Sequence, residues 1–149
     1  MGTYPVSALS DVITRRHREF LSGVDKFARA ATAIAGETVV KTTRVDTGLA
    51  RSNWRASVGA PTTANIPPYA PGSKLGLGEL ANAQAAITQH SQTLAGWKPS
   101  SGIRFYISNN VPYIGILNDG GPHVAPGNMV QMARQAWSVF IKSNVKVFK

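Results

Sequence analysis

Apolar residues recur at sevenfold spacing along the first part of the chain, with two more at the intervening four-residue steps: Ile13, Phe20, Val24, Phe27, Ala31 and Ile34. This spacing places them in one stripe along a helix, so we predict a long helix over residues 10 to about 43, with Ser10 as its N-cap. The stripe is longer than a small domain can bury, so part of the helix should pack on a neighbouring subunit. Gly23 and Gly36 weaken a helix, and two shorter core helices are the alternative.

Two shorter segments alternate between apolar and polar residues, which is the pattern of half-buried strands. In residues 52–59, Trp54 shares one face with Ala56 and Val58. Residues 103–108 alternate in the same way. We predict that the two segments pair as a small antiparallel sheet, with Trp54 anchoring the core.

Three further segments have the pattern of helices: residues 79–94, a short piece at 112–117, and residues 129–142 with Asn128 as the cap. The residues expected to point inward from the two longer ones are Leu80, Ala83, Ile87, Leu94, Val130, Ala133, Trp137, Phe140 and Ile141. The predicted fold class is therefore α+β. A long N-terminal helix and two further helices pack on a small antiparallel β-sheet.

The length of 149 residues is typical of one domain. We divide it into an N-terminal arm (residues 1–9), a folded body and a C-terminal tail (residues 143–149). Residues 60–78 hold four prolines and three glycines and show no periodicity, so they form an extended loop. Loops of this length are usually functional or mobile. We expect either a binding arm that orders on assembly or a disordered insertion.

The chain contains 16 Lys and Arg residues but only 7 Asp and Glu residues, which gives a net charge of +9. This excess of positive charge favours acidic partners. Duplex DNA and acidic protein surfaces are the candidates. One face of the predicted long helix carries basic residues that could contact phosphates without reading base sequence: Arg15, Arg18, Lys26 and Arg29. A solvated helix face is the alternative.

Catalytic chemistry has little support in the chain. There is no cysteine, which excludes disulfides, thiol catalysis and zinc–thiolate sites. The three histidines are far apart in sequence. His17 and His90 have no carboxylate or second histidine at metal-ligand spacing, and His123 has Asp119 nearby. We interpret His123 as a surface-loop residue. We expect no enzymatic activity, no cofactor and no metal. The absence of cysteine fits a protein made and used in cytosol, and the chain shows no secretory signal and no membrane-spanning run.

Two segments carry a resemblance to a known family. The first comprises Val45, Asp46, Thr47, Gly48, Arg51, Asn53 and Trp54. The second comprises Tyr106, Ile107, Asn109, Pro112 and Tyr113. In this order, behind a long helix and ahead of the segment 125–130, they resemble the neck or tail-completion proteins of long-tailed bacteriophages, the group that includes minor tail protein Z. Asn118 stands where that family often has a glutamate, which puts one local contact in doubt.

The resemblance implies a structural virion protein. Such proteins form a homo-oligomeric ring, of six or twelve copies by family analogy, at the head–tail neck or the top of the tail. The ring meets connector or head-closure proteins on one side and tail terminator or tail tube proteins on the other, surrounds the path of the genomic DNA, and assembles in the host cytoplasm. Asp46, Gly48, Arg51 and Trp54 would form a structural corner, with Arg51 paired to Asp46 or to a neighbour. The alternative is a basic, sequence-independent DNA-binding module.

Overall fold

The computed structural model describes residues 6–44, 47–71 and 78–148, with the backbone alone at 147 and 148. It has the predicted α+β class, with a long N-terminal helix, further helices and a two-stranded antiparallel sheet. In chain order the elements are α1 (Val6–Thr42), α2 (Leu49–Ser52), β1 (Arg55–Val58), α3 (Glu79–Gly96), the 3-10 turn η1 (Pro99–Ser101), β2 (Phe105–Ser108), α4 (Ile114–Asp119), α5 (Met129–Asn144) and the 3-10 turn η2 (Val145–Phe148).

The helix α1 is continuous over 37 residues, so the prediction of one long helix is confirmed and the alternative of two shorter helices is wrong. It begins at Val6. The predicted N-cap at Ser10, and an arm reaching to residue 9, are therefore also wrong. Gly36 is buried inside α1 because α3 approaches closely there. A Cβ atom at this position would lie 2.7 Å from Nδ1 of His90.

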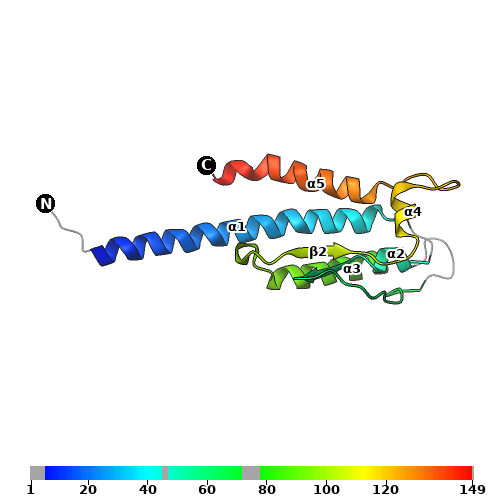
Figure 1. Ribbon diagram of the computed structural model, residues 1–149, viewed down its shortest axis with the longest axis horizontal. Helices are drawn as coiled ribbons and strands as arrows, with labels where there is room; N and C mark the ends of the chain where they lie inside the picture. The colour runs from blue at the N-terminus through cyan, green and yellow to red at the C-terminus, as the bar shows by residue number, and fades with distance from the viewer. Residues whose placement is uncertain (1–5, 45–46, 72–77, 149) are drawn as a thin grey trace.

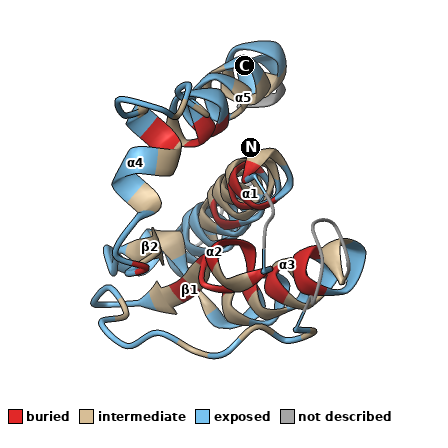
Figure 2. Ribbon diagram, turned by 90° about the vertical axis from the view of Figure 1, so that its right-hand side faces the viewer, coloured by how far each residue is buried: buried red, intermediate tan, exposed pale blue. Residues whose placement is uncertain are grey.

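The elements form layers around α1, which has α5 on one side and α3 with the sheet on the other (Figure 1). The helix α5 runs antiparallel to α1, and the rings of Phe27 and Phe140 lie 5.5 Å apart across this contact. Viewed along α1, the buried residues gather where α1 faces α2, α3 and the start of α5 (Figure 2). The core cluster consists of Val39, Val40, Trp54, Ala83, Ala86, Met129 and Ala133.

The sheet pairs β1 with β2 in the predicted antiparallel sense, with Ala56 opposite Ile107. The strand β1 begins at Arg55, later than predicted, because residues 49–52 turn into α2. Trp54 and Ala56 are buried as expected, whereas Val58 is 41% exposed because it lies at the end of the strand.

The predicted inward faces of α3 and α5 are confirmed in part: Ala83, Leu94 and Ala133 are buried, and Ile87 and Val130 pack against the core cluster. On α3, Leu80 is 85% exposed, and the buried positions include Asn82 and His90. On α5, Trp137 is 45% exposed. Asn128 does precede α5, but its side chain makes no capping hydrogen bond. The first turn of α5 is capped instead by Asn118, whose Oδ1 accepts from the Val130 amide at 3.0 Å.

The two remaining boundaries also differ from prediction. The short helix α4 begins at Ile114, two residues later than expected, because Pro112 lies in the turn before it. The tail after residue 142 is not separate from α5, which continues to Asn144 before η2.

The first part of the predicted loop is held against the body. The side chains of Asn53 and Asn82 bond to the backbone of Ile66 and Ala70, and Thr62 bonds to Ser108. Residues 60–71 contain no helix or strand, as predicted for the extended loop, but they are already ordered within the single subunit. Ordering only on assembly and a disordered insertion are therefore both wrong for these residues, because buried polar side chains bond to their backbone. Residues 72–77 lie outside the described residues.

Replacing Trp54 by Ala should strongly destabilise the protein. The side chain is buried in the core cluster, and Nε1 donates to Oγ1 of Thr43 at 2.7 Å. We expect the free energy of unfolding to fall by about 3–5 kcal/mol, measured by urea denaturation followed by circular dichroism. Trp54→Phe is the matched control and should lose less, because it retains most of the apolar volume. A Trp54→Ala variant with the wild-type midpoint would contradict the anchoring role.

Candidate functional site

The two motif segments meet in space. Nδ2 of Asn109, just after β2, donates to the carbonyl of Ala50 in α2 at 2.7 Å. Oδ1 of Asn109 accepts from the Val111 amide at 3.1 Å, which shapes the turn that leads into α4. Tyr113 of the second motif and residues of the first motif line one hollow of about 280 Å³. Its lining is Arg44, Thr47, Gly48, Leu49, Ala50, Tyr113 and Leu117.

Of the predicted site residues, Asp46 lies outside the described residues, as does Val45 of the same motif. Thr47 is exposed at the rim of the hollow. Pro112 is exposed in the turn before α4. The described part of the site is therefore a junction between two chain segments that are about sixty residues apart in sequence.

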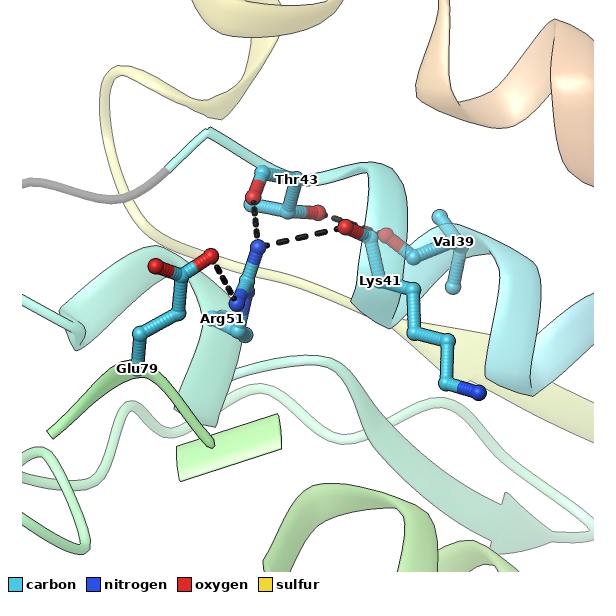
Figure 3. Close-up of polar contacts among 5 residues, drawn as sticks. All are labelled: Val39, Lys41, Thr43, Arg51 and Glu79. Atoms are coloured by element: carbon cyan, nitrogen blue, oxygen red, sulfur yellow. Dashed lines mark hydrogen bonds and ion pairs between the residues drawn. The ribbon is translucent and has the colours of Figure 1, made fainter. Parts of the chain in front are cut away.

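Arg51 follows Ala50 in the chain and lies in a hydrogen-bonded cluster that we call the polar corner (Arg51, Thr43, Trp54, Glu79 and His90). Nη2 donates to the carbonyls of Thr43 at 2.7 Å and Lys41 at 3.2 Å (Figure 3). Nη1 donates to Oε1 of Glu79 at 2.8 Å (Figure 3). A cation at the C-terminal carbonyls of a helix and an anion in the first turn of another both complement the helix dipoles. Arg51 thereby joins the end of α1 to the start of α3.

Among the described residues, the carboxylate partner of Arg51 is Glu79, which lies 28 residues away in sequence. The predicted pairing with Asp46 lies outside the described residues and stays a prediction, as does pairing with a neighbouring subunit. The guanidinium is buried, whereas Glu79 is 43% exposed at its side chain. Most of the effect of this group therefore comes from the helix carbonyls that it satisfies.

Thr43 links the polar corner to the core. Its hydroxyl donates to the carbonyl of Val39 at 2.6 Å and accepts from Nε1 of Trp54 at 2.7 Å. The carbonyl of Trp54 in turn accepts from Nε2 of His90 at 2.7 Å. One continuous set of hydrogen bonds therefore runs from α1 through the start of β1 to α3.

His90 is held in its neutral form. Burial lowers the pKa of its imidazole, and the hydrogen bond to the Trp54 carbonyl raises it by less. Because that carbonyl can only accept, Nε2 carries the proton, and a second proton would have to enter at Nδ1. Nδ1 faces Gly36 across a close contact and has no hydrogen-bond partner among the residues that the structure describes. His90 was predicted to lie on a helix without a metal partner, and its structural role was missed.

Gly48 is required by the local backbone. Its φ angle of 82° lies in the left-handed region that favours glycine. A Cβ atom here would also lie 2.2 Å from Nδ2 of Asn82. Both constraints come from the same turn, which starts α2 and presents Arg51 to the end of α1.

Three side-chain amides each bond both the N–H and the C=O of one distant residue. Asn53 does so with Ile66, and Asn82 does so with Ala70. Gln89 does the same with Ala56 in β1, at 2.9 Å for both bonds. Sequence reasoning missed Asn82 and Gln89, because nothing local marks a polar residue on a helix as buried.

The four predicted basic residues do not form one equivalent set. Arg15, Arg18 and Lys26 are exposed. Arg29 is half-buried and donates to the carbonyls of Asp25 and Ala95, both at 3.3 Å, in the seam between α1 and α3. Only the first three are placed to meet an external partner.

The N-terminal part of α1 extends beyond the rest of the fold (Figure 1). Residues 9–20 are all exposed. Its large apolar side chains include four that we call the ridge, with exposed fractions of 84% at Val6, 60% at Leu9, 60% at Ile13 and 57% at Phe20. They recur at spacings of three, four and seven, so they lie on one side of the helix. The sequence predicted this surplus apolar surface, and the structure leaves it uncovered.

The described residues hold no group of three or more His, Cys, Asp or Glu able to bind a metal ion. His17 and His123 are both exposed. No helix in the described part of the chain is long and apolar enough to cross a membrane. Comparison of the chain with protein-family models, with curated proteins and with solved structures finds no match.

Replacing Arg51 by Met should lower stability sharply. It removes the donor to two helix-end carbonyls and to Glu79 while keeping an apolar stem of similar reach. We expect the free energy of unfolding to fall by about 2–5 kcal/mol, measured by urea denaturation. Arg16→Met is the control, because it breaks an exposed pair with Glu19 and should cost at most about 1 kcal/mol. Equal losses in the two variants would refute the capping role.

Stability should depend on pH through His90. Its pKa is lowered in the folded protein from the ordinary histidine value of 6.5, so the unfolded chain binds the proton more readily. The stabilisation is therefore fully present above pH 6.5 and is lost as the pH falls below it. We expect the melting temperature of the wild type to drop between about pH 7.5 and pH 5.5. His90→Gln should show a smaller drop, and the same drop in both proteins would exclude His90 as the cause.

Proposed function

We propose that this protein is a structural subunit of a tailed-phage virion. It forms a homo-oligomeric ring at the head–tail neck or the top of the tail, around the path of the DNA. The ring completes the tail and joins it to the connector. In this role the chain contributes surfaces for assembly rather than a reaction centre.

The observation that carries the proposal is the ridge on the projecting part of α1. Monomeric proteins rarely expose contiguous large apolar side chains, and such patches mark interaction sites. Each of the four ridge residues is more than half exposed, although helix positions at this spacing normally face a partner. A subunit that packs on neighbours accounts for this surplus surface.

The resemblance to neck and tail-completion proteins gives the assembly its identity. The described motif residues Gly48, Arg51, Trp54 and Asn109 all hold elements together at the junction. That is the behaviour expected of a structural signature, because the described contacts of these residues join one element to another. Asn118, which stands where that family often has a glutamate, also has a structural role, because its amide oxygen accepts from the Val130 amide at the start of α5.

A second candidate function is a basic, sequence-independent DNA-binding module that acts alone. It is favoured by the net charge of +9 and by the exposed Arg15, Arg18 and Lys26 on α1. Phosphate contacts of this kind position a protein without reading bases, and their affinity falls steeply with salt. The ring proposal accommodates the same charge along the DNA path.

Native mass distinguishes the two candidates. We expect light scattering on a sizing column to give a defined multimer at physiological and at high salt, without DNA, because apolar contacts are not screened by ions. Electron microscopy of that multimer would then give its symmetry.

The competing outcomes are equally clear. A monomer that shifts only when duplex DNA is added, and less so at high salt, would favour the DNA-binding module. A monomer at all salt and protein concentrations, with or without DNA, would count against self-assembly of the chain.

A further inference from the structure

The ridge continues a face of α1 that is already used inside the subunit. Phe27 lies one sevenfold step beyond Phe20, and its ring packs against Phe140 of α5. The helix α5 ends at Asn144, so it covers this face only along the C-terminal part of α1. The ridge is therefore the uncovered extension of an existing helix–helix contact.

The shape of the ridge suits another protein surface better than a lipid surface. A repeat of seven residues marks a narrow seam between packed helices. Helices that lie in a membrane interface have a broad apolar face. In α1, Arg16 and His17 lie between Ile13 and Phe20 and narrow the apolar strip.

An apolar notch lies elsewhere on the same molecule, between α1, α5 and β2. Its volume is about 210 Å³, and its lining is Ala35, Val39, Trp54, Ile107, Val130, Ala133, Arg134 and Trp137. The alanines from α1 and α5 leave room that larger side chains would fill. Trp137 is 45% exposed, whereas Trp54 is nearly buried. The notch can therefore admit an apolar side chain from outside.

The ridge cannot fill the notch of its own subunit. Ile13 and Ala35 belong to the same straight helix and are about 33 Å apart at roughly 1.5 Å of rise per residue. A contact between ridge and notch must join two copies through different surfaces. Such head-to-tail contacts close into rings when the rotation permits.

One pair of opposite charges is available to this contact. Arg134 lines the notch and has no carboxylate partner among the described residues. Glu19 precedes Phe20 on the ridge, and its exposed pairing with Arg16 at 3.4 Å is weak. Docking Phe20 into the notch would bring a carboxylate toward Arg134.

We propose that the ridge of one copy docks into the α5 notch of the next, with Phe20 and Ile13 as the apolar anchors and Trp137 as the wall that receives them. This inference rests on the proposed ring and names the two surfaces that build it. The occupant of the notch is a second copy of this chain.

Two single variants and their mixture test the proposal. Phe20→Glu disrupts the ridge and leaves the notch intact. Trp137→Glu disrupts the notch and leaves the ridge intact. Each alone should weaken self-association by at least about 30-fold, as for a central interface residue, and run as a monomer where the wild type is a multimer. An equimolar mixture should form dimers and nothing larger, because one intact ridge can meet one intact notch.

Leu80→Glu is the matched control, since it makes the same kind of change at an exposed residue of α3 and should leave the multimer unchanged. Ile13→Glu is a second ridge variant, and circular dichroism melting verifies that each variant is folded. Anionic phosphatidylserine vesicles are included as a lipid probe.

The outcomes separate the inference from the ring itself. If the wild type is a multimer and Phe20→Glu or folded Trp137→Glu remains one, the ring stands and this interface is wrong. A multimer lost in both variants, with no dimer in their mixture, would show that the ridge of one copy does not pair with the notch of another and would overturn the interface. A wild-type monomer, or a monomer that binds vesicles through Phe20, would overturn both the interface and the ring.

Discussion

The contact between the Arg51 guanidinium and the C-terminal end of α1 is the interaction on which the rest of the structure depends. It satisfies the carbonyls of Lys41 and Thr43 and reaches Glu79 at the start of α3. Helix-end carbonyls lack partners within the helix, so they need a donor when they are buried. The turn at Gly48 is therefore constrained, because it must deliver Arg51 to that point.

Side-chain amides allow a very small sheet to be stable. A two-stranded sheet is marginal alone, and its outer edges present unpaired backbone groups. Here Gln89 of α3 bonds both backbone groups of Ala56, and Asn53 and Asn82 do the same for the extended segment beside it. These amides replace the neighbouring strands that a larger sheet would supply. The extended segment is consequently part of the body.

The fold combines a packed body with a projecting N-terminal part of α1 that carries exposed apolar side chains. The polar corner anchors the C-terminal end of α1 to α2 and α3, and α5 packs along the same part of the helix. A helix that is held at one end projects its other end in a defined direction. The exposed ridge and the exposed Arg15 and Arg18 are therefore presented together at a set distance from the body. This arrangement suits a subunit whose work is to contact neighbours.

The sequence by itself determined the α+β class, the continuous stripe on α1, the antiparallel pairing of the two strands and the surplus of apolar surface on the first helix. These properties depend on local periodicity, which can be read along the chain. Only the tertiary structure decided that Arg51 meets Glu79 and two helix carbonyls, that Asn82 and His90 face inward while Leu80 faces out, and that residues 60–71 are held to the body. Each of these outcomes depends on which backbone groups come to lie opposite a polar side chain. That geometry arises only when helices and strands distant in sequence pack together.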